Sequence, residues 1–354
     1  MRLKASASAA ALALIAGCGD LTSTGPVTEA HYDWYASNGT LTCAARGGEG
    51  WCRSLDGTVT LDELEVREFA LGEPHACALA KSGAVWCWGQ DPAAVGRSGD
   101  PAVPAAVEAD ARFTSVSSSG WRTCAVADDG MVWCWGSEFQ LGSGPFGWAV
   151  PDLPEWCDAN ACLRPTPMPA PVGFTAVGLG KGHACGLTRG GEIWCWGRNT
   201  AGQLGRGNAA EPDACEGIEC GQAPAPIAAP VRFDALAVTE LGGCGLGRDG
   251  AAWCWGRGDG TPMETGGYRF VSLTGGRVVC GLGGDRVAHC WEAAGAEPDP
   301  ELATPLDARP HRVPSLYFDR LFPSLGISCG ANGVTGVACW SGLDGEPKVV
   351  PGQL

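Results

Sequence analysis

The stretch HACALAKSGAVWCWGQD, residues 75–91, carries two cysteines ten positions apart and a tryptophan on each side of the second cysteine. If Cys77 and Cys87 face each other on two antiparallel strands, Ala78 faces Trp86 and residues 81–83 form the turn. A three-residue hairpin loop requires a left-handed residue at its last position, where glycine costs least, and Gly83 stands there. The stretch therefore predicts a β-hairpin clipped by a disulfide.

Near-copies of this stretch test the register. RTCAVADDGMVWCWGS (122–137), HACGLTRGGEIWCWGR (183–198) and GGCGLGRDGAAWCWGR (242–257) again end the turn with glycine and place a small residue opposite the first tryptophan. The small residue predicts that each of these tryptophans packs between repeats. Opposed cysteines would have Cα atoms roughly 4.5 to 5.5 Å apart, which a disulfide tolerates, and each bridge should contribute roughly 2 to 3 kcal/mol. Zinc is disfavoured, because paired zinc ligands usually stand two to four residues apart.

The cysteine count agrees with a disulfide framework. Of the 19 cysteines, Cys18 stands apart near the N-terminus and the others fall into local pairs. Paired cysteines in a chain with an export signal indicate disulfides. The predicted pairs are Cys43 with Cys52, Cys77 with Cys87, Cys124 with Cys134, Cys157 with Cys162, Cys185 with Cys195, Cys215 with Cys220, Cys244 with Cys254, Cys280 with Cys290, and Cys329 with Cys339.

The N-terminus resembles the export signal of a bacterial lipoprotein. Arg2 and Lys4 precede an apolar stretch, residues 5–17, that is too short to span a membrane, and Cys18 follows directly. The resemblance implies that residues 1–17 are a signal peptide and that Cys18 carries lipid, with residues 18–30 as a flexible tether. Gly19 rather than aspartate follows the cysteine, which by resemblance to enterobacterial sorting indicates the outer membrane. A cleaved signal without lipid is the alternative.

Composition narrows the fold and the partners. The chain contains 55 glycines and 25 prolines, only 18% of its residues are charged, and no long stretch repeats apolar residues with helical spacing. This profile favours many short strands with tight turns. The formal charge of −15, without a compensating run of lysine and arginine, disfavours nucleic-acid binding.

A longer repeat surrounds the hairpin. A Phe-x-x-(Val/Leu) strand precedes it at Phe113, Phe174, Phe233, Phe270 and Phe318, and proline-rich stretches such as 165–172 and 223–231 read as links to the next copy. The sequence GHACGLTRGGEIWCWGRNTAGQLGRG (182–207) resembles the repeat of the regulator of chromosome condensation family. The resemblance covers residues 31–354 in seven copies, of which three are weak. It implies an all-β fold, a seven-bladed β-propeller with four strands and one disulfide-clipped hairpin per blade.

No catalytic constellation is visible in the sequence. Gly245, Gly247 and Gly250 match a dinucleotide-binding pattern, but they stand inside a hairpin and no helix follows. His75 and His183 hold the same repeat position, which favours a structural hydrogen bond near the Phe strand over catalysis. We therefore expect neither an enzyme, nor a cofactor, nor a metal site.

Two long insertions, at about 137–165 and 198–223, are the best candidates for recognition. The first contains Phe139, Phe146, Trp148 and Trp156, and aromatic side chains on rigid loops are typical binding anchors. The alternative is that these aromatics pack under their own loop.

The leading hypothesis is a monomeric, non-catalytic module, anchored by lipid to the bacterial cell envelope, that binds an unknown protein or glycan. The membrane would be contacted through the lipid alone. A second hypothesis is an enzyme inhibitor, because some secreted bacterial propellers of this repeat type block β-lactamases. An envelope enzyme with a site on the loop face is a weaker third hypothesis.

Overall fold

The computed structural model describes residues 33–38, 40–54, 57–61, 64–137, 154–157, 161–207, 213–215, 218–256, 260–276, 278–291, 310–314, 316–322, 328–332, 336–340 and 347–349. The predicted signal peptide, the tether and Cys18 lie outside these residues, as do Phe139, Phe146 and Trp148.

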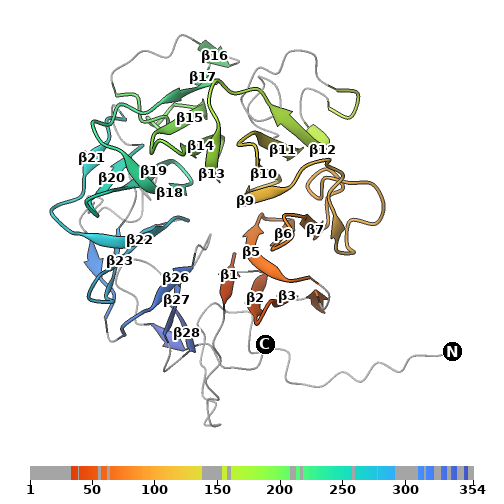
Figure 1. The fold of residues 1–354 in the computed structure, drawn as a ribbon, viewed down its shortest axis with the longest axis horizontal. Helices are drawn as coiled ribbons and strands as arrows, with labels where there is room; N and C mark the ends of the chain where they lie inside the picture. The colour runs from red at the N-terminus through yellow and green to blue at the C-terminus, as the bar shows by residue number, and fades with distance from the viewer. Residues whose placement is uncertain are drawn as a thin grey trace, which may run out of the picture.

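The described chain forms seven antiparallel sheets arranged as blades around an axis (Figure 1). This confirms the seven-bladed propeller. The first strand of each blade lies innermost; the last strand lies outermost in the six four-stranded blades, whereas in blade 4 β16 lies outside β17. The strands of blades 1 to 3 are β1 (Trp34–Ser37), β2 (Thr42–Arg46), β3 (Glu49–Ser54), β4 (Gly57–Leu61), β5 (Val66–Leu71), β6 (His75–Ala80), β7 (Val85–Gly89), β8 (Ala105–Ala106), β9 (Phe113–Ser119), β10 (Arg122–Ala127), β11 (Val132–Ser137) and β12 (Ala161–Met168).

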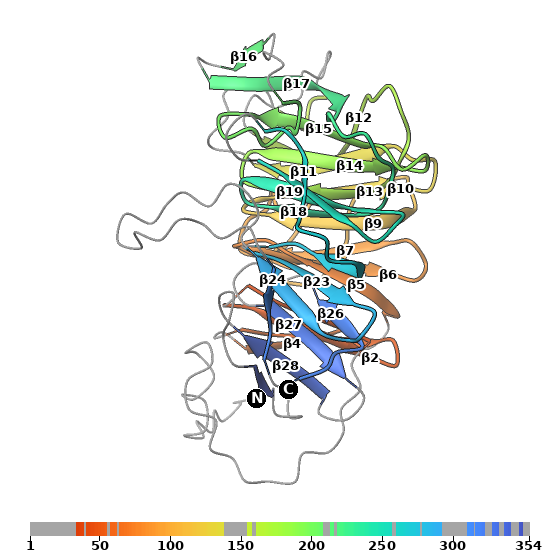
Figure 2. The same ribbon diagram turned by 90° about the vertical axis from the view of Figure 1, so that its left-hand side faces the viewer.

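Blade 4 has five strands, because a short hairpin lengthens its outer edge (Figure 2). The strands of blades 4 to 7 are β13 (Phe174–Leu179), β14 (His183–Thr188), β15 (Ile193–Arg198), β16 (Asp213–Cys215), β17 (Ile218–Pro226), β18 (Phe233–Thr239), β19 (Gly242–Gly247), β20 (Ala252–Trp255), β21 (Met263–Glu264), β22 (Phe270–Thr274), β23 (Val279–Gly283), β24 (Ala288–Trp291), β25 (His311–Arg312), β26 (Arg320–Phe322), β27 (Ser328–Asn332), β28 (Gly336–Trp340) and β29 (Lys348–Val349).

The first part of each proline-rich stretch is a strand rather than a link. β12 includes residues 165–168 and is the outer strand of blade 3, and β17 includes residues 223–226, which lie beyond Cys220, where its pairing with β16 ends. An outer strand tolerates proline because the missing N–H can face away from the ladder. The insertion after β11 is therefore shorter than the sequence indicated, since it ends where β12 begins at Ala161.

The hairpin register is confirmed in every blade. Cys77 pairs with Cys87 and Ala78 with Trp86, and the other six hairpins follow the same rule. In each hairpin the two opposed cysteines form a disulfide. These bridges join Cys43 to Cys52, Cys77 to Cys87, Cys124 to Cys134, Cys185 to Cys195, Cys244 to Cys254, Cys280 to Cys290, and Cys329 to Cys339.

The spacing of these bridges corrects one expectation. All seven hairpin disulfides have Cα separations of 4.0 to 4.1 Å, shorter than the expected range. The amide of Ala80 donates to the carbonyl of Ala84, so these two residues form a hydrogen-bonded pair. Because hydrogen-bonded and non-hydrogen-bonded pairs alternate along an antiparallel ladder, Cys77 and Cys87, three positions further on, form a non-hydrogen-bonded pair. Antiparallel strands approach most closely at such pairs, which accounts for the short separation.

The turn of each hairpin also connects one blade to the next. Gly83 and its equivalents Gly130, Gly191 and Gly250 have φ angles from 83 to 89°. The carbonyl of Gly83 accepts a 2.7 Å hydrogen bond from the amide of Phe113, which begins the next blade. The sixth blade puts Arg286 at this position, with φ 68°, and its carbonyl likewise accepts the amide of Phe318 at 2.8 Å.

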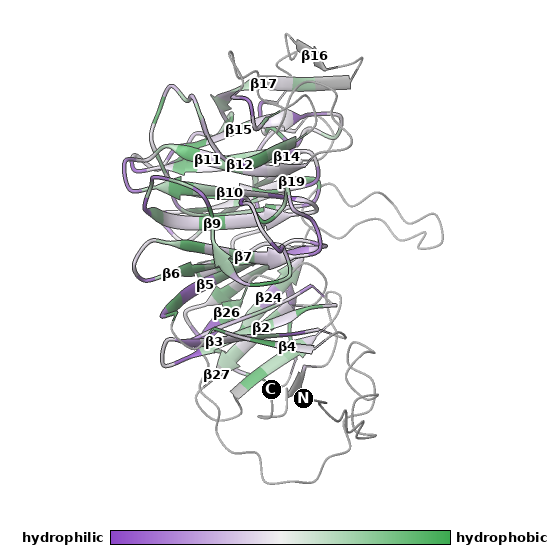
Figure 3. Ribbon diagram, turned by 90° about the vertical axis from the view of Figure 1, so that its right-hand side faces the viewer, coloured by the Kyte–Doolittle hydropathy of each residue, from purple (hydrophilic) through white to green (hydrophobic). Residues whose placement is uncertain are grey.

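Between neighbouring blades, a disulfide packs against two aromatic rings. Cys77 and Cys87 of blade 2 are buried in one cluster with Phe113 and Trp135 of blade 3. The same arrangement recurs around the ring, and Figure 3 shows hydrophobic residues along the strands and hydrophilic residues gathered in the turns. The core of the protein is therefore a series of layers between blades.

The structure corrects the explanation of the small residue opposite the first tryptophan. The tryptophan that follows the second cysteine, present in every hairpin except the first, is buried, and Trp196 is fully buried, whereas Trp194, which precedes that cysteine, is half-buried. A Cβ atom on Gly186 would lie 2.5 Å from the ring of Phe174, so the residue is small because that ring covers it. The Phe174 ring in turn lies 5.9 Å from Trp196, between centroids.

The ring closes by side-chain packing between blades 7 and 1. Each blade is formed from strands that are consecutive in the chain, so among the described residues no strand is shared across the closure. The ring of Phe322 lies 6.2 Å from those of both Trp34 and Tyr35, and the guanidinium of Arg320 donates to the carbonyl of Asp33.

The two equivalent histidines form polar bridges between blades. Nε2 of His75 lies 2.6 Å from the Thr123 hydroxyl of blade 3, and Nε2 of His183 donates to the carbonyl of Gly242 in blade 5 at 3.3 Å. Both hydrogen bonds end beside a Phe strand, as expected: the Thr123 hydroxyl also contacts Ser118 at the end of β9, and Gly242 pairs with Thr239 at the end of β18. Complete burial lowers the pKa of each histidine to about 4.

The two tryptophans of one hairpin should differ in their contribution to stability. Replacing the fully buried Trp196 with alanine should lower the free energy of unfolding by about 3 to 5 kcal/mol, through lost burial and the cavity left behind. Trp194→Ala, at a half-buried position, should cost less than about 2 kcal/mol. Denaturant unfolding with the disulfides intact measures both changes, and equal losses would contradict the layered core.

Stability should fall as the pH drops from 6.5 to about 4. Because both histidines have a folded-state pKa of about 4, below the ordinary value of 6.5, the unfolded chain binds more protons in this window. Each histidine should lower the free energy of unfolding by up to about 1.4 kcal/mol for every pH unit in this window. This loss of stability should level off once the pH is below the folded-state pKa. The variant with both His75→Gln and His183→Gln should show a shallower pH dependence of unfolding, and an unchanged slope would exclude this origin.

Candidate binding surface on the insertion face

The two faces of the propeller carry different loops. The turn from the first to the second strand and the connection from the third to the fourth strand lie on one face, which we call the insertion face. Its described residues include 90–104, 120–121, 154–157 and 199–207. The disulfide-clipped turns lie on the opposite face, which we call the hairpin face.

Trp156, predicted as a binding anchor, is held in place by its own loop. The side chain is half-buried, and its indole N–H donates to the Thr166 hydroxyl at 3.1 Å. The guanidinium of Arg164 lies over the ring, 5.7 Å from its centroid. A disulfide between Cys157 and Cys162 closes this loop. Trp156 therefore supports Arg164 rather than projecting freely into solvent.

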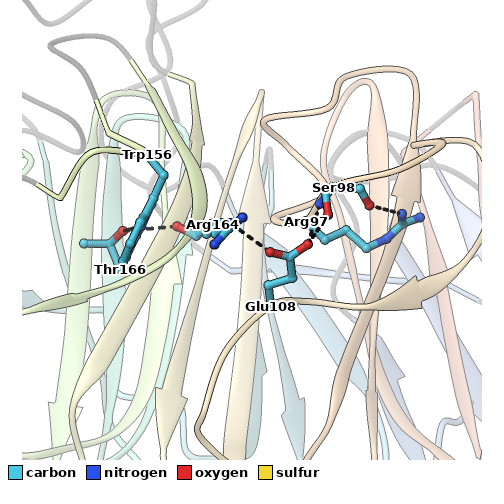
Figure 4. Close-up of polar contacts among 6 residues, drawn as sticks. All are labelled: Arg97, Ser98, Glu108, Trp156, Arg164 and Thr166. Carbon is cyan, nitrogen blue, oxygen red and sulfur yellow. Dashed lines mark hydrogen bonds and ion pairs between the residues drawn. The ribbon is translucent and has the colours of Figure 1, made fainter.

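Arg164 continues into a polar network between blades 2 and 3 (Figure 4). Its Nε lies 2.8 Å from one carboxylate oxygen of Glu108, and the other oxygen accepts the amide of Ser98 at 2.8 Å and also its hydroxyl. Arg97 donates to the carbonyl of Ser98 at 3.0 Å. The hydrogen bonds from Ser98, aided by Arg164, lower the pKa of Glu108, so this carboxylate stays ionised at neutral pH.

Two apolar side chains, Val103 and Leu163, are exposed beside the network, and a third, Trp121, is exposed nearer the axis on the same face. Val103 is 55% exposed, Leu163 50% and Trp121 39%. Leu163 directly precedes Arg164 and its amide donates to the carbonyl of Trp156, while Val103 accepts from Arg97 through its carbonyl. Trp121 stands in the turn between β9 and β10, where its carbonyl accepts the amide of Ser137.

This arrangement has the chemistry of a recognition surface. Charges of both signs are ordered here, Glu108 by hydrogen bonds from Ser98 and Arg164 by its ion pair and the Trp156 ring, and exposed aliphatic and aromatic groups share the same face. Protein interfaces use apolar anchors surrounded by polar groups in the same way. Sequence reasoning missed Glu108 and Arg164, because they are 56 positions apart and only the packing of blade 3 on blade 2 brings them together.

A loop motif of blade 4 is also present, unrecognised, in blade 2. In the segment 199–205, Leu204 is fully buried and the carbonyl of Gln203 accepts the indole N–H of Trp255 at 2.9 Å. The carbonyl of Ala94 accepts the indole N–H of Trp135 at 3.1 Å in the same manner. Three features repeat in this second copy: a buried apolar residue, a left-handed glycine and an arginine, at Val95, Gly96 and Arg97.

Other predicted residues are only partly described. Cys220 is disulfide-bonded, and the side chain of its predicted partner Cys215 lies outside the described part. Within the described residues, no group of three histidine, cysteine, aspartate or glutamate side chains could hold a metal ion. None of the described segments is a helix with the length and apolarity needed to cross a membrane.

Family models match the central blades. The Regulator of chromosome condensation (RCC1) repeat matches residues 113–140 and 174–203 in one model and 190–238 in another. These matches cover the first three strands of blade 3, the strands of blade 4 and nearly all of β18, the first strand of blade 5. The comparison with curated protein sequences finds no match.

Solved structures share the architecture. Prp20p from Saccharomyces cerevisiae superposes with a TM-score of 0.63 at 18% identity, over 82% of this chain and 78% of that protein. Human WBSCR16 gives 0.64 at 16% identity, with 83% of each chain covered. The CRINKLY WD40 ectodomain of the Arabidopsis thaliana receptor kinase ACR4 gives 0.56 at 18% identity, over 90% of this chain and 98% of the ectodomain.

The repeat matches, the seven blades and the shared architecture agree with one another. The protein is therefore a seven-bladed β-propeller with RCC1 repeats at residues 113–140 and 174–238, in which each blade is clipped by a hairpin disulfide.

Proposed function

We propose that the protein is a non-catalytic binding module, anchored by lipid in the bacterial cell envelope outside the cytoplasm. Two features support this location. Residues 1–18 resemble the export signal and lipidated cysteine of a bacterial lipoprotein, and the cysteines of the hairpins form disulfides. Disulfides persist in oxidising compartments outside the cytoplasm. The similar propeller of a plant receptor kinase is an ectodomain, which is consistent with such a location.

The partner is proposed to be a protein that docks on the insertion face over blades 2 and 3. The observation that carries this proposal is the exposure of Val103 and Leu163 beside the ordered Glu108 and Arg164 pair, with Trp121 exposed on the same face. Two of the three exposed apolar side chains are aliphatic, which suits a protein surface better than a sugar ring. Prp20p, a propeller of similar architecture, has binding properties toward Gsp1p and histones, so the fold can present protein-binding surfaces.

Rigidity supports the same site. The Cys157–Cys162 disulfide and the interblade ion pair fix the backbone around Leu163 before any partner arrives. A surface that is ordered in the free protein loses little conformational entropy on binding. The two charges also offer orientation, because a partner must match both signs.

Leu163→Asp together with Trp121→Ala should weaken partner capture at least tenfold, about 1.4 kcal/mol, in a pull-down from envelope extracts with the soluble domain. Both side chains are substantially exposed, so the melting temperature should change little. Val271→Asp is the matched control, because Val271 is 63% exposed at the start of β22, toward the hairpin face. Equal capture by wild type and the double variant would move the site elsewhere. Capture of a hydrolytic enzyme that loses activity on binding would identify the module as an inhibitor.

Cys18→Ser should abolish membrane association. The thioether that carries the lipid cannot form on serine, and the rest of the predicted signal and tether lacks a membrane-spanning segment. Fractionation of cells that express wild type and variant measures the change. If both proteins sediment with membranes to the same extent, the lipid anchor is refuted while the insertion-face site is untouched.

A further inference from the structure

A cavity of about 330 Å³ lies at the axis of the propeller. In each blade, one residue of the innermost strand pairs with the first cysteine of the hairpin. The cavity exists because this residue is small in most blades. Six of the seven blades have alanine, serine, glycine or threonine there, and blade 7 has Phe322. The six are Ala36, Ala70, Ser117, Gly178, Ala237 and Thr274.

The walls of the cavity are mostly apolar, with one charged group. Leu71, Val116, Leu179 and Leu273 line it together with the hydroxyl groups of Ser117 and Thr274. Among the described residues that line it, Glu68 is the only one whose side chain ionises. A cavity of this size is at the lower end of the range for small-molecule sites, which combine apolar walls with a few fixed polar groups.

Glu68 reaches across the boundary between blades 2 and 3. One carboxylate oxygen accepts the amide of Val116 at 3.0 Å. No described lysine, arginine or histidine side chain forms an ion pair with this carboxylate. The neighbouring Arg67 is exposed to solvent and attracts it only at longer range. Burial raises the pKa of Glu68, which shows the cost of a desolvated charge without a close counter-ion.

We propose that this cavity binds a small organic amine, whose ammonium group pairs with Glu68 and whose apolar body fills the space between the small residues. An ammonium supplies a counter-charge that no described side chain provides in an ion pair, and it donates to the remaining lone pairs of the carboxylate. The hydroxyls of Ser117 and Thr274 offer further acceptors at the wall. A divalent metal is a poorer fit, because a single carboxylate provides too few ligands, and an anion is repelled.

The cavity is independent of the insertion-face site. It lies on the axis between the inner strands, whereas Glu108, Leu163 and Trp156 belong to the outer strands and connections of blades 2 and 3. An amine could therefore bind whether or not a protein partner docks, and failure of one proposal leaves the other standing.

Calorimetric titration of the soluble domain tests the proposal with two amines, benzylamine and n-butylamine, and their neutral isosteres, benzyl alcohol and n-butanol. At least one amine should bind at least tenfold more tightly than its isostere, a difference of about 1.4 kcal/mol. Glu68→Gln should abolish this preference, while its amide oxygen can still accept the amide of Val116 and preserve the fold. Glu65→Gln, at a carboxylate that is 73% exposed, is the control and should bind like wild type.

A second variant tests the location. Ala237→Leu should fill the cavity and block amine binding, with Ala237→Val as the milder replacement if the leucine variant does not fold. The proposal is overturned if neither amine binds at millimolar concentration, if the alcohols bind equally well, or if Glu68→Gln keeps the preference for amines. Unchanged binding in a folded Ala237 variant would also overturn it, because the amine would then bind elsewhere.

Discussion

The packing of each hairpin disulfide beneath the aromatic rings of the next blade is the interaction on which the propeller depends. The apolar side chains on the two sides of a four-stranded blade are buried only when neighbouring blades cover them. The stability of a repeat protein therefore depends on the interfaces between its units. The Cys77–Cys87 disulfide links two strands of blade 2, and the same disulfide packs against the rings of Phe113 and Trp135 in blade 3. The turn glycine adds a backbone hydrogen bond to the same Phe residue. One local clip therefore sets both the register of a blade and its contact with the following blade.

The closure between blades 7 and 1 uses the same chemistry with different residues. The first hairpin has Arg53 where other blades carry the buried tryptophan, so the aromatic layer must be rebuilt from other positions. Tyr35 and Phe322 supply the rings, and the disulfide between Cys329 and Cys339 again packs against them. Because every described strand pairs within its own blade, this interface holds the ring closed through side chains and the Arg320 hydrogen bond.

Local constraints could be predicted from the sequence, whereas contacts between blades could not. The hairpin register follows from the positions of two cysteines and a turn glycine and from the alternating direction of side chains along a strand, all within about a dozen residues. The partner of His75 is 48 positions away, and nothing in either segment identifies Thr123 as that partner. Trp156 was recognised as a candidate because it is aromatic and outside the repeat, but the arginine and hydroxyl that hold it depend on the path of β12. The proline-rich stretches were read as links because sequence does not show that they lie at the edge of a sheet, where proline is tolerated.

The axial cavity follows from the same row of residues that carries the disulfide. Ala70, Cys77, Cys87 and Ala105 are successive cross-strand neighbours, and opposed residues on paired strands project to the same side of a sheet. The Cys77–Cys87 disulfide fills the space between blades at the centre of these four residues. Ala70, on the innermost strand, can therefore be small without leaving a void between the blades. The space that it frees opens toward the axis, where Glu68 stands one level nearer the hairpin face. A device that stabilises the blades thus leaves room for a ligand at their centre, while the loops that vary from blade to blade remain available for recognition on the insertion face.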